Sequence, residues 1–149
     1  MIQYAINHST QHDVEQHLLT CDESFPNRLS SRVDIPSYAS KLAEKAIRFE
    51  AWDDEALVGL IACYNNTENR SVYITSVSTL ENYHGKGIAQ ELLNQVIQHT
   101  NTLQYKKIEL EVHAVNYKAI ALYTKNGFEE TNIAGDEEMK KLTYFTIRE

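Results

Sequence analysis

The sequence is poor in cysteine and in clusters of basic residues, and each shortage excludes a class of protein. Among 149 residues only Cys21 and Cys63 are cysteines, and they lack the spacing of a metal site, so we expect two small buried apolar side chains. Lysine and arginine form nothing longer than pairs such as Lys106-Lys107, and the formal net charge is −7. A nucleic-acid partner is therefore not expected, and an amine or cationic substrate is favoured.

Long apolar runs are also missing. No stretch approaches the roughly 20 apolar residues that span a bilayer, so we expect no membrane contact. Residues 1–7 lack the basic start and apolar run of a signal peptide, which makes cytoplasmic residence the default expectation. The length suits one compact domain, and we expect a single domain over residues 1–149.

The spacing of apolar residues predicts strands and helices along the whole chain. Helical spacing predicts a helix capped by Thr10, a second that begins around Asp34, a long third helix after Gly87, and a short fourth at residues 116–126 that Gly127 ends. Alternating or β-branched segments predict strands at residues 2–7, 46–52, 56–64, 71–80, 107–114, 128–133 and 142–147. The long helix joins two strands as in a parallel right-handed unit. The expected fold class is α+β, with helices flanking one mixed, mostly antiparallel sheet.

A glycine-containing turn leads from the strand at residues 71–80 directly into the long helix. It reads Asn82-Tyr83-His84-Gly85-Lys86-Gly87. Free N–H groups and the positive dipole end at a helix start attract anions, and glycines let a pyrophosphate approach the main chain. Lys86 can add a positive charge. The same glycines are also compatible with a tight turn of no functional meaning, so the turn alone leaves both interpretations open.

Two stretches resemble signatures of the Gcn5-related N-acetyltransferase (GNAT) superfamily. The coenzyme A pyrophosphate loop of that family reads Gln/Arg-x-x-Gly-x-Gly/Ala and falls here on residues 82–87, with Asn82 in place of the usual Gln or Arg and Ala89 where a further glycine is frequent. The family pattern Asn-x-x-Ala-x-x-Leu-Tyr-x-x-x-Gly-Phe is matched at every fixed position by residues 116–128. The pair Val58-Gly59 is a weaker third match. The resemblance is close over residues 47–128 and extends, by element order, to the whole chain.

The resemblance implies a GNAT-like fold, acetyl-CoA as the acyl donor, and no metal. Relatives open a V between the strands at residues 71–80 and 107–114, where main-chain groups near Val77 and Thr79 pair with pantetheine and an amide near Val77 donates to the acetyl oxygen. Asn116 also suits the N-cap of its helix. The residues expected to bind the donor are Val77, Thr79, His84, Gly85, Lys86, Gly87, Ile88, Ala89, Asn116, Ala119 and Tyr123.

Two residues are candidates for the chemistry. By resemblance, the hydroxyl of Tyr123 protonates the departing thiolate, although Tyr123 also suits a core position. Glu111 lies five residues before Asn116, the spacing at which the ribosomal-protein alanine acetyltransferases carry a glutamate base. Glu111 equally suits a solvated strand glutamate, or a partner for Lys106 or Arg70. His113 and a water-relayed base remain alternatives.

The acceptor is expected to be a primary amine of a small molecule, an amino sugar or a peptide N-terminus, and the sequence is compatible with a homodimer. Relatives shape the acceptor site with the region that here contains Arg28, Arg32, Asp34 and Tyr38. One alternative function is a catalytically weak coenzyme A-binding module that acts as a sensor or scaffold. A nucleotide-binding α/β protein is disfavoured because no Ser or Thr follows Lys86 to hold magnesium.

Overall fold

A computed structural model describes residues 1–22, 28–131 and 138–146, which form one seven-stranded mixed sheet with helices on both faces. The order of the strands across the sheet is β1-β2-β3-β4-β5-β7-β6, and every neighbouring pair is antiparallel except β4 and β5. The strands are β1 (Ile2–Ile6), β2 (Ile47–Asp53), β3 (Ala56–Asn66), β4 (Ser71–Thr79), β5 (Lys107–His113), β6 (Glu129–Glu130) and β7 (Met139–Phe145). The predicted fold class is confirmed.

The four predicted helices are present, and their starts follow the predicted caps. They are α1 (Gln11–Asp22), α2 (Ile35–Lys45), α3 (Ile88–Thr102) and α4 (Tyr117–Lys125), with 3₁₀ turns at Leu29–Ser31 and Glu81–Tyr83. At the start of α1, the Asp13 N–H donates to Thr10 Oγ1 at 3.2 Å and the Thr10 N–H donates to Asp13 Oδ2 at 2.9 Å, a reciprocal capping arrangement. The Asp34 carboxylate caps α2 by accepting from the Ser37 N–H.

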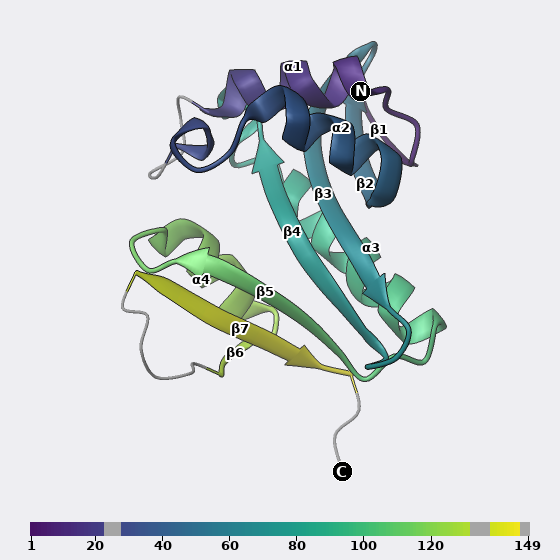
Figure 1. Cartoon of the computed structure of the whole chain (residues 1–149), viewed down its shortest axis with the longest axis vertical. Coiled ribbons are helices and arrows are strands. Elements are labelled where there is room, and N and C mark those ends of the chain that lie inside the picture. The colour runs from purple at the N-terminus through teal and green to yellow at the C-terminus, as the bar shows by residue number, and fades with distance from the viewer. Residues whose placement is uncertain (23–27, 132–137, 147–149) are drawn as a thin grey trace.

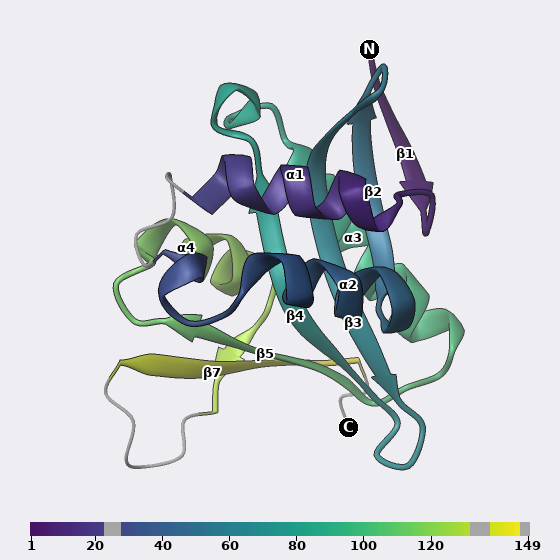
Figure 2. The same ribbon diagram turned by 45° about the horizontal axis from the view of Figure 1, so that its top comes forward.

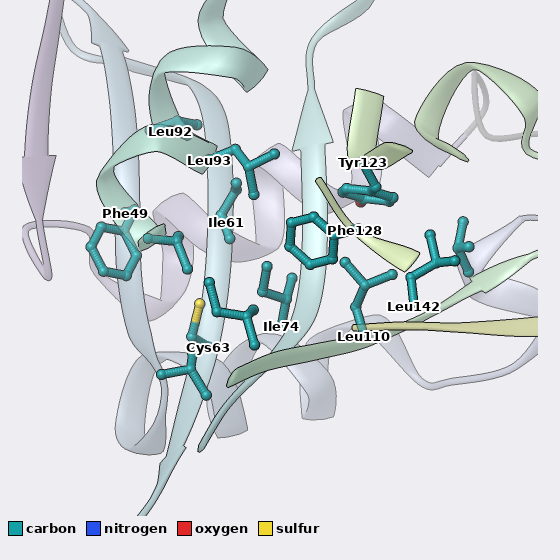
Figure 3. Packing of buried hydrophobic residues seen from close by; sticks show 14 of the residues in the cluster. Phe49, Ile61, Cys63, Ile74, Leu92, Leu93, Leu110, Tyr123, Phe128 and Leu142 are labelled. Atoms are coloured by element: carbon teal, nitrogen blue, oxygen red, sulfur yellow. The ribbon is translucent and has the colours of Figure 1, made fainter. Parts of the chain in front are cut away.

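Helices cover both faces of the central strands, so β3 is buried along most of its length. Figure 2 shows α1 and α2 in front of β2, β3 and β4, with α3 behind them. Because side chains alternate along a strand, Leu60 and Ala62 join the core cluster under α1 and α2, whereas Ile61 and Cys63 join the cluster under α3. Figure 3 shows the second cluster, which continues from Phe49 to Leu142.

The two middle strands of the sheet separate along their length. β4 and β5 pair only from Ser71 opposite Lys107 to Ile74 opposite Leu110. On the other side of β4, Cys63 opposes Ile74 while Ala62 opposes Ser76, so Thr75 is the extra residue of a β-bulge. A bulge bends its strand and increases the local twist, and pairing with β5 stops at the same place. The strands then diverge, as Figure 1 shows.

Hydrogen bonds from α1 and α2 hold the diverging half of β4. The His17 side chain on α1 lies between β3 and β4: Nδ1 is 2.8 Å from the Leu57 carbonyl oxygen and Nε2 is 2.7 Å from Ser78 Oγ. Since a carbonyl oxygen only accepts, Nδ1 donates to Leu57, and Nε2 of the neutral ring accepts from the Ser78 hydroxyl. On α2, the Tyr38 hydroxyl lies 3.0 Å from the Thr75 carbonyl oxygen.

The C-terminal part of the sheet differs in detail from the prediction. The strand expected at residues 128–133 is reduced to Glu129–Glu130, with residues 132 and 133 outside the described part. The strand expected at residues 142–147 begins earlier, at Met139, because its pairing with β5 extends to His113 opposite Met139. β7 pairs with β5 on one side and with β6 on the other, so it lies between them. In the described part of the chain, no helix has the length and apolar character needed to cross a lipid bilayer.

Candidate active site

The glycine-containing turn forms an open cradle at the start of α3. Gly85 and Gly87 both have φ of +77°, in the left-handed region that favours glycine, and Gly87 occupies the N-cap position of α3. A Cβ added at either residue would meet no heavy atom within 4 Å, so the space above the main chain is empty. The His84 imidazole Nε2 donates to the Thr79 carbonyl oxygen at 2.9 Å and ties the turn to the end of β4.

Close packing with β3 fixes the start of α3. A Cβ on Gly59 would lie 2.6 Å from Ile88 Cγ2 and 3.3 Å from Ala51 Cβ. Because Ile88 is buried and branched at Cβ, it has little freedom to move away. The absence of a side chain at Gly59 therefore lets the first turn of α3 sit directly on the sheet.

A cavity of about 370 Å³, here called the glycine-loop cavity, opens beside the cradle and α4. Of the residues that the sequence predicts to bind the donor, all except Lys86 line it; the Lys86 side chain is exposed and lies outside the lining. Its full lining is Val77, Ser78, Thr79, Tyr83, His84, Gly85, Gly87, Ile88, Ala89, Gln90, Asn116, Lys118, Ala119, Leu122, Tyr123 and Lys125.

One face of α4 also contributes to this cavity, and the sequence patterns did not predict it. Lys118, Leu122 and Lys125 line the cavity and follow one another at spacings of four and three residues. Residues at these spacings lie on the same face of a helix. That spacing within the predicted helix at residues 116–126 is the signal that could have identified them. The two lysines add positive charge to the wall facing the glycine turn.

A second cavity of about 140 Å³, here called the strand-gap cavity, occupies the space where β4 and β5 diverge. It is lined by Leu29, Arg32, Tyr38, Ile74, Thr75, Ser76, Val77, Leu110, Glu111, Val112, His113, Asn116, Tyr123 and Met139. Three residues, Val77, Asn116 and Tyr123, line both cavities. The two cavities therefore meet at these side chains and at the main chain of β4.

Main-chain groups of β4 face the gap at this junction. The Leu80 N–H donates to the Val58 carbonyl oxygen, which makes these two residues a hydrogen-bonded pair of the antiparallel ladder. Hydrogen-bonded and non-hydrogen-bonded pairs alternate in such a ladder, and the register pairs Thr79 with Gly59 and Val77 with Ile61. The main-chain groups of Val77 and Thr79 therefore point away from β3, toward the opening between β4 and β5.

Tyr123 belongs to the hydrophobic core and also to the junction of the cavities. It is only 4% exposed and its ring centroid lies 5.6 Å from that of Phe128; Figure 3 shows both rings among the buried side chains. Burial raises the pKa of the Tyr123 hydroxyl, so the group is protonated throughout the neutral range. The two interpretations of Tyr123 are thus compatible, since its ring packs in the core while the residue lines both cavities.

Glu111 lies in the wall of the strand-gap cavity. It is exposed, as the solvated interpretation expects, and it forms no ion pair with Lys106 or Arg70. None of the described residues forms an ion pair with it, whereas Glu109, two residues earlier on β5, contacts Lys141 at 2.7 Å and Lys107 at 3.6 Å. His113 lines the same cavity, and its Nδ1 accepts from the Val115 N–H at 3.3 Å. A neutral His113 ring in this arrangement carries its proton on Nε2.

Other predicted residues divide between the site and the surrounding structure. Asn116 caps α4 by accepting from the Ala119 N–H at 3.3 Å, as its type predicts, and lines both cavities. Arg32 and Tyr38 line the strand-gap cavity, while Arg28 and Asp34 do not. Within residues 1–22, 28–131 and 138–146, no group of three His, Cys, Asp or Glu side chains is placed to hold a metal ion.

The chain belongs to the acetyltransferase (GNAT) family, whose model matches residues 11–128. Among curated proteins, it is 38% identical over 121 residues to an N-alpha-acetyltransferase of Saccharolobus solfataricus, which covers 72% of each chain. It is 31% identical over 88 residues to the N-acetylaspartate synthetase of Xenopus tropicalis, covering 59% of this chain and 32% of that protein. It is 33% identical over 91 residues to a spermine/spermidine N(1)-acetyltransferase of Bacillus subtilis, covering 58% and 60%. The match thus spans about a third of the synthetase's length.

Solved structures share the fold along nearly the whole chain. The ribosomal-protein-S18-alanine N-acetyltransferase of Escherichia coli superposes with a TM-score of 0.76 at 18% identity, over 97% of this chain and 94% of that one. The PaiA N-acetyltransferase of Thermoplasma acidophilum, solved in complex with coenzyme A, gives a TM-score of 0.72 at 17% identity, over 96% and 99%. At these identities the likeness concerns the fold.

Proposed function

We propose that this chain transfers the acetyl group of acetyl-CoA directly to a primary amine of a small molecule, an amino sugar or a peptide N-terminus. The observation that carries the proposal is the meeting of two cavities at Val77, Asn116 and Tyr123. One cavity contains an anion-binding cradle at a helix start, and the other contains a carboxylate. The names of the curated relatives, which concern amines of different sizes, agree with an amine acceptor.

The glycine-loop cavity suits the donor. The pyrophosphate of coenzyme A would lie over Gly85 and Gly87, where main-chain N–H groups and the dipole of α3 stabilise negative charge. The pantetheine arm would then run along β4 and pair with the main chain of Val77 and Thr79, as an added strand does. Asn116 and Ala119 border that path from α4. This route brings the thioester to the junction of the cavities.

The chemistry then needs three groups. Glu111, directly or through a water, takes a proton from the ammonium of the acceptor, and the freed amine attacks the thioester carbonyl carbon. The main-chain N–H of Val77 stabilises the oxyanion that forms. When the tetrahedral intermediate collapses, the carbon–sulfur bond breaks and the Tyr123 hydroxyl protonates the departing thiolate. The nitrogen of the new amide gives up its second proton, which restores the tyrosine. The products are the amide and free coenzyme A, and one proton is released to solvent overall.

Between the two candidate bases, the geometry favours Glu111. A neutral His113 that accepts from the Val115 N–H has its free proton on Nε2, so that nitrogen donates and cannot accept a proton. Glu111 keeps its carboxylate free of ion pairs with the described residues, and a carboxylate accepts protons without change of tautomer.

Two measurements test the proposal. Coenzyme A or acetyl-CoA should raise the melting temperature, because a ligand that binds only the native state stabilises it by about 2.7 kcal/mol at 100 times its dissociation constant. ATP and NAD should have little effect, and equal shifts with all three ligands would contradict the donor assignment. Release of coenzyme A thiol should then appear with acetyl-CoA and at least one member of an amine library.

The same assay separates the enzyme from a coenzyme A-binding sensor or scaffold. Stabilisation by coenzyme A without thiol release for any amine in the library would favour the sensor. The carboxylate of Glu111 weighs against that alternative. β4 contains no Asp or Glu, and Glu111 on β5 provides a possible base in the strand-gap cavity.

A further inference from the structure

Two opposite charges line the strand-gap cavity, and neither has an ionic partner among the described residues. Arg32 enters from the C-terminal end of the 3₁₀ turn Leu29–Ser31, and Glu111 enters from β5. Both side chains are exposed, and no described residue forms an ion pair or a side-chain hydrogen bond with either. Two other charged groups behave differently: Glu109, also on β5, is held by two lysines, and Arg48 on β2 is buried among hydrogen-bond acceptors and Glu50.

The rest of the lining adds hydrogen-bonding groups but no second full charge among the described residues. These groups include the side chains of Tyr38, Thr75, Ser76, His113 and Asn116. The cavity thus offers one guanidinium and one carboxylate. An arginine fork matches a carboxylate with two parallel hydrogen bonds, and the five donors of the guanidinium cannot lose their charge at neutral pH.

We propose that the acceptor is a zwitterion of the amino-acid class, with its amine toward Glu111 and its free carboxylate on Arg32. This assignment rests on the proposed function and narrows it. The polyamine and N-terminal peptide classes fit less well: a polyamine would bring a second positive charge toward Arg32, and an internal peptide bond would leave the guanidinium without its carboxylate partner. Like-charge contact and an unpaired charge both act against the wrong acceptor.

Matched acceptors test the carboxylate directly. A free α-amino acid and its primary amide share the amine and the side chain and differ only in the charged group. Wild-type protein, assayed with acetyl-CoA across a set of such pairs and with spermidine, should show kcat/KM at least about tenfold higher for the best free amino acid than for its amide. Spermidine should be poorer than that amino acid.

Variants assign the preference to Arg32. Arg32→Gln should lower kcat/KM for the amino acid by about tenfold, chiefly through KM, and change the amide by less than about twofold. Arg32→Lys should recover part of the loss, since the charge is kept and the fork is not. Lys45→Gln is the matched control: it also removes one exposed positive charge near α2, outside the cavity, and should leave both acceptors unchanged.

Failure of this inference differs from failure of the proposed function. Turnover that prefers amides or spermidine, or an Arg32→Gln effect equal for amino acid and amide, would overturn the zwitterion assignment while acetyl transfer to amines stands. If no acceptor turns over, titration calorimetry of amino acids into the coenzyme A complex decides: heat that disappears in Arg32→Gln supports the inference, and no heat overturns it.

Discussion

The hydroxyl of Tyr38 donates a hydrogen bond to the main-chain carbonyl oxygen of Thr75, 3.0 Å away. Thr75 is the extra residue of the bulge at which β4 leaves β5, so its carbonyl has lost its place in the ladder. A partly buried carbonyl without a donor is costly, and Tyr38 supplies one from α2. The contact joins α2 to the strand whose main chain is proposed to face the thioester.

Tyr38→Phe should therefore disturb the site more than the fold. Removal of one partner from a partly buried hydrogen bond costs about 1 kcal/mol of unfolding free energy. Because the bulge sets the direction of the main chain at Val77, we expect kcat with acetyl-CoA to fall several-fold with little change in donor affinity. Chemical denaturation and steady-state kinetics measure the two effects.

Tyr64→Phe is the control for that change. The Tyr64 hydroxyl is buried and has no hydrogen-bond partner among the described residues, and its ring lies 5.7 Å from the Lys41 ammonium. Removal of an unsatisfied hydroxyl should leave stability unchanged or raise it, and activity should stay at the wild-type level. A loss of kcat as large as that of Tyr38→Phe would show that any tyrosine change on this face is harmful.

Tyr123→Phe keeps the ring in the core and removes only the proposed proton donor. Turnover should fall by roughly 100-fold or more, which is the range for a positioned acid, while coenzyme A affinity and melting temperature stay near wild type. The measurement requires saturating acceptor and a chemical step that limits the rate. A variant within about threefold of wild type would remove Tyr123 from the mechanism and leave its core packing as its role.

Gly85→Glu introduces a side chain and a negative charge where the pyrophosphate is proposed to lie. Calorimetry should show coenzyme A affinity reduced by at least about tenfold, equal to about 1.4 kcal/mol. The open space around Gly85 should let the fold persist, with a modest cost for a non-glycine residue at φ of +77°. Asn69→Glu adds the same charge in the exposed turn at the far end of β4 and should bind normally. Unchanged affinity in Gly85→Glu would locate the phosphate site elsewhere.

Gly59→Ala tests how the cradle is held against the sheet. The added methyl would lie 2.6 Å from Ile88 Cγ2, so the first turn of α3 must shift. Overpacking of this kind costs about 1–3 kcal/mol, which denaturant unfolding measures. We also expect weaker coenzyme A binding, because Gly87 and the helix start would move with Ile88. Stability and affinity both equal to wild type would mean that α3 adjusts without moving the cradle.

His17 should make the fold sensitive to acid. Burial lowers its pKa to about 4, below the value of about 6.5 in the unfolded chain. The unfolded state therefore binds the proton first, and the free energy of unfolding should fall by about 1.4 kcal/mol for each unit that pH drops below 6.5, until about pH 4. Above pH 6.5 this contribution is constant.

Variants on the same helix separate this effect from general acid denaturation. His17→Gln can still donate to the Leu57 carbonyl and accept from Ser78, and it should flatten the dependence of stability between about pH 4 and 6.5. His12→Gln removes an exposed histidine from α1 and should keep the wild-type slope. Equal slopes in all three proteins would assign the acid sensitivity to other groups.

Local signals in the sequence predicted most of the fold. Thr10 with Asp13, and Asp34 with Pro36, mark helix starts that the structure reproduces, because caps and first-turn residues act within one turn of the chain. The pattern at residues 116–128 likewise predicted α4 and its Asn116 cap. It could not predict that β7 lies between β5 and β6, because strand order depends on pairings between residues far apart in sequence.

The features of the candidate site that the sequence could predict are those that depend on local main-chain conformation, and the features that it missed depend on long-range contacts. Gly85 and Gly87 could be recognised because their conformation is local. The residue type at position 75 does not predict a bulge, because threonine is also common in regular strands. The bond between His17 and Ser78 joins residues 61 positions apart, and no local period reveals it. Lys86 was predicted to bind the donor because of its position in the turn, but its side chain lies outside the cavity lining.

Because both cysteines are buried, the folded protein should give no thiol signal in an assay that detects free coenzyme A. Cys21 and Cys63 are the only thiols of the chain, and they are 1% and 0% exposed. Burial raises the pKa of the Cys21 thiol to about 12, so almost no reactive thiolate exists at neutral pH. A disulfide dye that detects free coenzyme A will therefore report product without labelling the folded protein. A slow additional signal of two thiols per chain would measure unfolding during the same experiment.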